Sequence, residues 1–96
     1  MNERRGYALI TGASAGIGAA FARELASRKV DLVLTARRLD RLQSLASELM
    51  ATHTIKVEVI ACDLAVQEAP RHLVAQLEEW RIPIDMLINN AGYGVT

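Results

Sequence analysis

The chain has 96 residues, of which 51% are hydrophobic and 23% are charged, and its eleven basic residues balance its eleven acidic ones. This length suits one small domain, the composition is typical of a globular protein, and the absence of net charge argues against a nucleic-acid partner recognised by charge. The single cysteine, Cys62, excludes an internal disulfide and favours a cytoplasmic setting, and no apolar run is long enough to span a membrane.

Four short runs of apolar and β-branched residues predict β-strands. We place these strands at residues 7–10, 30–35, 54–60 and 84–89. The third run alternates apolar and charged residues before it becomes apolar, which is typical of a strand near the edge of a sheet.

Apolar residues at helical spacing fill the gaps between these runs. They predict helices at 17–28 and 39–51, and a third that has Pro70 in its first turn. The expected packing faces are Ile17, Phe21 and Leu25 in the first helix, Leu39, Leu42, Leu45 and Leu49 in the second, and Leu73, Leu77 and Trp80 in the third. Strands joined by crossover helices imply a parallel sheet. We therefore predict an α/β fold of Rossmann type, an incomplete doubly wound sheet with four strands and three helices.

A glycine-rich segment, TGASAGIG at 11–18, joins the first strand to the first helix. A phosphate bound there would meet the free N–H groups and partial positive charge of a helix N-terminus. Glycine lets a phosphate approach the backbone, and Ser14 offers a hydroxyl donor. The spacing G-x-x-x-G-x-G departs from the usual dinucleotide pattern G-x-G-x-x-G. The alternative is a tight turn that only packs the helix against the strand.

Two arginines, Arg37 and Arg38, follow the second strand after Ala36. A dinucleotide fold that prefers NAD carries an acidic residue near this place, to bind the ribose 2′-hydroxyl. A guanidinium instead suits a 2′-phosphate, because its fork of N–H groups binds two oxygen atoms. The pair therefore predicts a preference for NADP over NAD. The alternative is that both arginines only open a solvated helix.

Three motifs together resemble the short-chain dehydrogenases/reductases. Residues 11–18 match the family pattern T-G-x-x-x-G-I-G, and residues 89–92 match its N-N-A-G segment. Asp63 and Leu64 match the position of the usual aspartate after the third strand. The motifs follow the ends of the first, third and fourth strands in the family's order, and the resemblance covers the whole chain.

The resemblance implies which residues bind NADP(H). These are Gly12, Ser14, Gly16, Ile17 and Gly18 for the pyrophosphate and adjacent ribose, Arg37 and Arg38 for the 2′-phosphate, Asp63 and Leu64 for the adenine, and Asn90, Ala91 and Gly92 toward the nicotinamide ribose. It implies that Asn89 ties neighbouring strands together. Ala15 stands where NADP-preferring members often carry a basic residue, so phosphate recognition would rest on Arg37 and Arg38 alone.

The chemistry of this family is hydride transfer between the nicotinamide and a carbonyl or alcohol. Its acid/base is a tyrosine, helped by a lysine four residues later, a serine and an asparagine. Neither Tyr7 nor Tyr93 is followed by such a lysine, so we assign no catalytic residue. We expect residues 1–96 to be the NADP-binding part, inactive alone, with the catalytic C-terminal part and the small-molecule substrate site found only in a complete protein.

Two alternatives to this interpretation stay open at this point. The chain could be a truncated non-enzymatic module that binds a nucleotide or a partner, or a remnant that does not fold. In the family the fourth strand is central, so residues 84–89 would here form an open sheet edge beside an apolar patch. We therefore expect poor stability or self-association through that edge. His53 and His72 lack a second ligand at useful spacing and predict no metal site, and Cys62 is expected to fill a small space at a strand end.

Overall fold

The computed structural model describes residues 6–13, 16–63 and 68–90. Strands and helices alternate in the order β1 (Tyr7–Thr11), α1 (Gly16–Ser27), β2 (Leu32–Ala36), α2 (Leu39–Thr52), β3 (Val57–Ala61), α3 (Ala69–Glu79) and β4 (Ile84–Asn89). The predicted α/β alternation is confirmed, although β2 and β3 begin later than expected.

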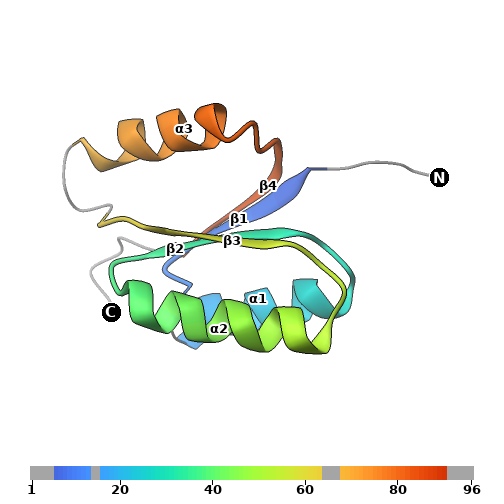
Figure 1. Cartoon of the computed structure of the whole chain (residues 1–96). Coiled ribbons are helices and arrows are strands. Elements are labelled where there is room, and N and C mark those ends of the chain that lie inside the picture. Colours follow the sequence, from blue (N-terminus) through green and yellow to red (C-terminus); the bar gives the residue numbers. More distant parts are fainter. Residues whose placement is uncertain (1–5, 14–15, 64–67, 91–96) are drawn as a thin grey trace.

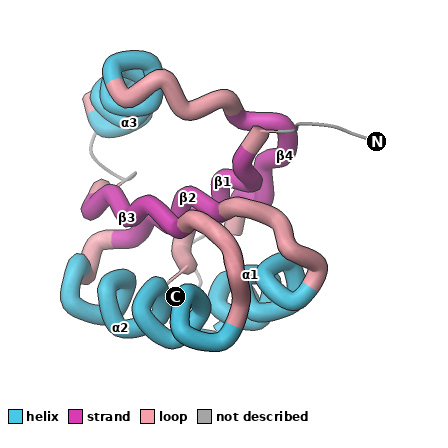
Figure 2. The backbone as a smooth tube through the Cα atoms, turned by 45° about the vertical axis from the view of Figure 1, so that its right-hand side comes forward, coloured by secondary structure: helices cyan, strands magenta, loops and turns pink. Residues whose placement is uncertain are grey.

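The four strands form one parallel sheet in the order β3-β2-β1-β4. Helices α1 and α2 cover one face, and α3 lies over the opposite face (Figures 1 and 2). The prediction that β3 lies at a sheet edge is confirmed. Because all strands are parallel, their carboxyl ends meet at one edge of the sheet, where the β1–α1 turn also lies.

Two apolar clusters hold the helices to the sheet. The larger lies between the sheet and α1–α2, and the smaller lies beneath α3, where Leu9 and Val33 meet Leu73 and Leu77. Side chains alternate between the faces along β1, so Leu9 belongs to the α3 side and its neighbours Ala8 and Ile10 to the other. The larger cluster includes Ala8, Ile10, Ala22, Ala26, Leu32, Leu34, Leu42, Leu45 and Leu49.

The expected packing face of α1 is wrong. The side chains of Ile17 and Phe21 are 66% and 42% exposed, and Leu25 is only half-buried. The helix instead buries a face of small residues, namely Gly18, Ala19, Ala22 and Ala26. Small side chains let the helix axis lie close to β1 and β2. The same correction holds for Leu39 and Trp80, which belong to predicted faces but are largely exposed.

Strand β4 forms the other edge of the sheet and pairs only with β1 within the described residues. Leu87, on this strand, is 59% exposed, and Met86 beside it is also exposed. Within the described residues, β4 is therefore an edge strand with exposed apolar side chains, as expected. Self-association through this edge stays a prediction.

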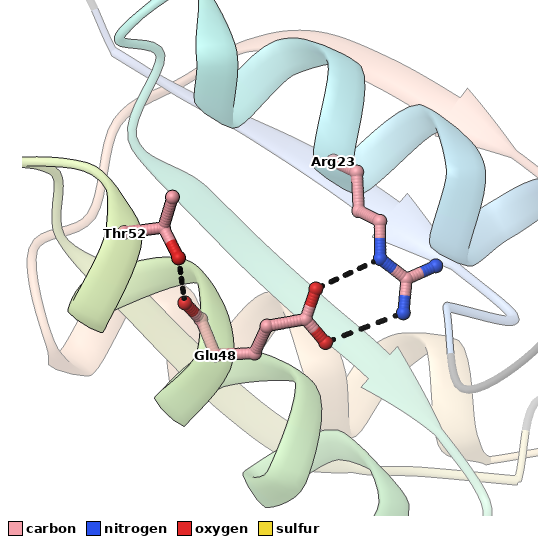
Figure 3. Close-up of polar contacts among 3 residues, drawn as sticks. All are labelled: Arg23, Glu48 and Thr52. Atoms are coloured by element: carbon pink, nitrogen blue, oxygen red, sulfur yellow. Dashed lines mark hydrogen bonds and ion pairs between the residues drawn. The ribbon is translucent and has the colours of Figure 1, made fainter.

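An ion pair joins α1 to α2 at the surface (Figure 3). Arg23 donates from Nε to Oε2 of Glu48 at 2.9 Å and from Nη2 to Oε1 at 3.3 Å. Thr52 donates its hydroxyl to the backbone carbonyl of Glu48 at 2.9 Å, one turn further along α2. Both charged side chains are about half exposed, so the pair links the two helices at the surface and contributes little to stability.

Candidate functional site

The turn between β1 and α1 depends on glycine at two positions. Gly12 has φ of 64° and Gly16 has φ of 62°, in the left-handed region that glycine adopts without steric cost. A Cβ added to Gly16 would meet no atom of the described residues within 4 Å. Gly16 is exposed and places no side chain at the first residue of α1.

Gly18 is required for a different reason, close packing. A Cβ there would overlap the carbonyl oxygen of Gly12, and it would lie 2.9 Å from the carbonyl carbon of Gly12 and 3.0 Å from Nδ2 of Asn90. Asn90 donates from Nδ2 to the same carbonyl oxygen at 3.4 Å. Gly18 and Asn90 therefore converge on the carbonyl of Gly12 and hold the turn against the start of α1.

Hydrogen bonds at Thr11 lock the carboxyl ends of β1 and β4 together. Thr11 is buried, donates its hydroxyl to Oδ1 of Asn89 at 3.0 Å, and accepts the backbone N–H of Asn90 at 2.8 Å. The prediction that Asn89 ties neighbouring strands is confirmed by this bond. The role of Thr11 was not predicted from the sequence, although a hydroxyl residue stands directly before the first glycine of the motif.

The carboxyl end of β2 lies between the glycine turn and the end of β3. The backbone N–H of Ala13 donates to the carbonyl of Thr35 at 3.1 Å, and that of Cys62 donates to the carbonyl of Ala36 at 2.8 Å. Arg37 is the next residue after β2 and is exposed. These bonds bring the glycine turn, the start of the arginine pair and the end of β3 to the same edge of the sheet.

The two arginines differ in their surroundings. No residue in the described part of the chain forms an ion pair with Arg37. Arg38 pairs with Asp40, donating from Nε to Oδ1 at 3.2 Å and from Nη2 to Oδ2 at 3.1 Å. The hydrogen bonds from Arg38 hold the pKa of the Asp40 carboxyl below its usual value. This ion pair was not predicted from the sequence.

Eight of the twelve predicted binding residues lie in the described part of the chain. All eight lie at or beside the carboxyl edge of the sheet: Gly12, Gly16, Ile17, Gly18, Arg37, Arg38, Asp63 and Asn90. Asp63 is half-buried two residues after β3, and Ile17 is exposed in the first turn of α1. The predictions for Ser14, Leu64, Ala91 and Gly92 fall outside the described residues. Their roles toward a ligand stay predictions.

Cys62 is half-buried beside this edge and packs against the cluster beneath α3. The pKa of its thiol is raised, chiefly because the thiol is partly buried. The thiolate is the reactive form, so its fraction at neutral pH is smaller than in a free cysteine. We expect Cys62 to react more slowly with iodoacetamide at pH 7.5 in the folded chain than in the urea-unfolded chain.

The measurement is the rate of alkylation followed by mass spectrometry, between pH 7 and pH 10. The folded chain should approach the unfolded rate only as the pH rises through the raised pKa. Equal rates at pH 7.5 would contradict the burial of the thiol.

Within the described residues, no three His, Cys, Asp or Glu side chains gather as a metal ion would require, and no helix is long and apolar enough to cross a membrane.

A parallel sheet with helices on both faces, and with a glycine turn at the carboxyl end of its first strand, defines a nucleotide-binding unit of Rossmann type. The family model described as short chain dehydrogenase matches residues 6–96. The chain belongs to this family and carries its nucleotide-binding portion. The alternative of a non-enzymatic module is not favoured.

Similar proteins include enzymes whose structures contain NADPH. The chain is 40% identical over 86 residues to a very-long-chain 3-oxoacyl-CoA reductase of Vanderwaltozyma polyspora, covering 90% of this chain and 25% of the reductase. It is 42% identical to a short-chain dehydrogenase from Sphingobium yanoikuyae in complex with NADPH (TM-score 0.82), covering 92% of this chain and 34% of the other. It is 37% identical to L-sorbose reductase from Gluconobacter frateurii complexed with NADPH and L-sorbose (TM-score 0.84), covering 93% and 34%. The chain thus spans a quarter to a third of these proteins.

Proposed function

We propose that the chain binds NADP(H) at the carboxyl edge of its sheet, as the cofactor-binding portion of a short-chain oxidoreductase. The observation that carries this proposal is the glycine turn. Gly18 lets α1 start against the carbonyl of Gly12, while a Cβ on Gly16 would meet no atom of the described residues at the start of the helix. A pyrophosphate needs such a place, where backbone N–H groups are free and no side chain blocks its approach. The residues present therefore fit the cofactor.

In this proposal each strand end contributes to a different part of the cofactor. Gly12, Ser14, Gly16, Ile17 and Gly18 border the pyrophosphate and adjacent ribose, Asp63 and Leu64 flank the adenine, and Asn90, Ala91 and Gly92 lead toward the nicotinamide ribose. The half-buried position of Asp63 near the end of β3 supports its part. Asn90 also has a structural role, because its hydrogen bond to the carbonyl of Gly12 helps to hold the turn.

The preference for NADP over NAD rests on charge at the end of β2. Ala36 carries no carboxylate that would repel a 2′-phosphate, and Arg37 is exposed with no ion-pair partner in the described part of the chain. A charged hydrogen bond from a guanidinium to a phosphate contributes more than a neutral one. The NADPH complexes of two similar proteins, from Sphingobium yanoikuyae and Gluconobacter frateurii, support the same preference.

For the whole protein we propose hydride transfer between NADP(H) and the carbonyl or alcohol group of a small molecule. The bound nicotinamide supplies or accepts the hydride. The described residues of this chain bind and orient the cofactor, and the acid/base residues belong to the catalytic part of the whole protein.

Replacing Arg37 by methionine tests the proposal directly. We expect wild-type chain to bind NADPH more tightly than NADH, and Arg37→Met to weaken NADPH binding by about 10- to 100-fold, because a charged contact to phosphate is lost. NADH binding should stay unchanged. Isothermal titration calorimetry with both cofactors measures this.

Arg71→Met is the matched control, since Arg71 is an exposed arginine on α3 over the opposite face of the sheet. It should bind both cofactors as the wild type does. Equal affinities of the wild type for NADPH and NADH would contradict the NADP preference, and failure to bind either would contradict the proposed function.

A further inference from the structure

The pair formed by Arg38 and Asp40 has the geometry that a guanidinium also uses for phosphate. Nε and Nη2 of Arg38 each meet one oxygen of the Asp40 carboxylate, at 3.2 Å and 3.1 Å. This two-pronged contact is the arrangement by which arginine binds both carboxylate and phosphate oxygens. The Nε–Nη2 edge of Arg38 therefore cannot bind Asp40 and a phosphate at the same time.

Asp40 is well placed to keep this edge occupied. It lies in the first turn of α2, where the partial positive charge of the helix N-terminus favours an anion. Its hydrogen bonds with Arg38 lower its pKa, so its carboxylate stays charged throughout the neutral range. Both side chains are more than 60% exposed, so an incoming anion has access to the pair.

We propose that Asp40 competes with the 2′-phosphate for Arg38. By holding Arg38 away from the cofactor, Asp40 lowers the affinity for NADP(H). This inference rests on the proposed function. The two adjacent arginines then differ in how readily they can bind the phosphate. Arg37, with no ion-pair partner among the described residues, is available at once, and Arg38 becomes available only when it leaves Asp40.

Release of Arg38 from Asp40 is expected to raise the NADPH affinity, by a small factor. An exposed ion pair is weak, so Arg38 is bound to Asp40 for only part of the time. The apparent affinity of a ligand falls in proportion to the fraction of the protein in the competent state. Release of Arg38 should therefore tighten NADPH binding by about two- to fivefold.

The test compares the NADPH and NADH affinities of the wild type, Asp40→Asn, Arg38→Met and the double variant by calorimetry. We expect Asp40→Asn to bind NADPH about two- to fivefold more tightly and NADH unchanged. In the Arg38→Met background, Asp40→Asn should give no gain, because the competitor acts through Arg38.

Glu48→Gln is the matched control. It also removes one carboxylate from α2 and frees one arginine, Arg23 (Figure 3). Glu48 lies in the second half of α2, whereas Asp40 lies in its first turn. It should leave NADPH binding unchanged, and a gain equal to that of Asp40→Asn would overturn the proposal.

The remaining outcomes each decide the question. Unchanged or weaker NADPH binding by Asp40→Asn overturns the competition while the proposed function stands. A gain that persists without Arg38 also overturns it, since Asp40 would then repel the phosphate directly. A wild type that binds neither cofactor overturns the proposed function and this inference with it.

Discussion

Replacing Gly18 by alanine is expected to destabilise the chain by about 1–3 kcal/mol and to weaken NADPH binding severely. The added Cβ would overlap the carbonyl oxygen of Gly12, which is backbone and cannot move without displacing the β1–α1 turn. Helix propensity alone predicts that Gly18→Ala would be more stable than the wild type, because alanine in a helix interior is favoured over glycine by about 0.5–1 kcal/mol. The packing of α1 against the turn therefore decides the outcome.

Urea unfolding followed by circular dichroism measures the change in the free energy of unfolding, and calorimetry measures NADPH binding. Ala20→Ser is the control, because Ala20 is exposed on the same helix, and it should change stability by no more than about 0.5 kcal/mol. If Gly18→Ala matched or exceeded the wild type in stability, the close contact with Gly12 would be refuted.

The order of elements is predictable from local pattern. Each strand is a short apolar run, each helix has apolar residues at helical spacing, and the glycines at 12, 16 and 18 mark the turn between the first strand and first helix. Those features act within a few residues of one another. The parallel topology follows from the alternation itself, because parallel strands need crossover connections.

The buried face of α1 could not be chosen from spacing. Ile17 and Phe21 recur at helical spacing, but so do Ala19, Ala22 and Ala26 on another side of the same helix. Hydrophobicity favours the large residues, whereas the close approach of α1 to the sheet, required at Gly18, admits only small ones. Tertiary contacts with the sheet, and not the local sequence, therefore decide which face of α1 is buried.

The site was predictable where motifs mark strand ends, and not where it depends on contacts between side chains. The bonds of Thr11 to Asn89 and Asn90 join positions 78 and 79 residues apart, so no local pattern contains them. The pair between Arg38 and Asp40 has a spacing of two, which is not a regular neighbour relation on a helix. It depends on the extended backbone at Arg38, just before α2 begins.

Replacing Leu42 by alanine is expected to cost about 2–5 kcal/mol, the largest loss of any change considered, since it opens a cavity in the main core. The side chain of Leu42 is fully buried, between the sheet and α2. The total stability of a typical domain is about 5–15 kcal/mol. A cost of this size should therefore lower the midpoint of urea unfolding greatly or leave the chain largely unfolded.

Leu39→Ala provides the matched comparison on the same helix. Leu39 falls on the same face as Leu42 by spacing, but its side chain is 42% exposed, so its loss should cost no more than about 1 kcal/mol. Urea unfolding of both variants, followed by circular dichroism at low protein concentration, separates burial from spacing. Equal losses of unfolding free energy would mean that Leu39 is packed as tightly as Leu42, in conflict with its observed exposure. A large loss for Leu42 alone would support a core that begins one turn into α2 and leaves the end beside Arg37 and Arg38 open to solvent.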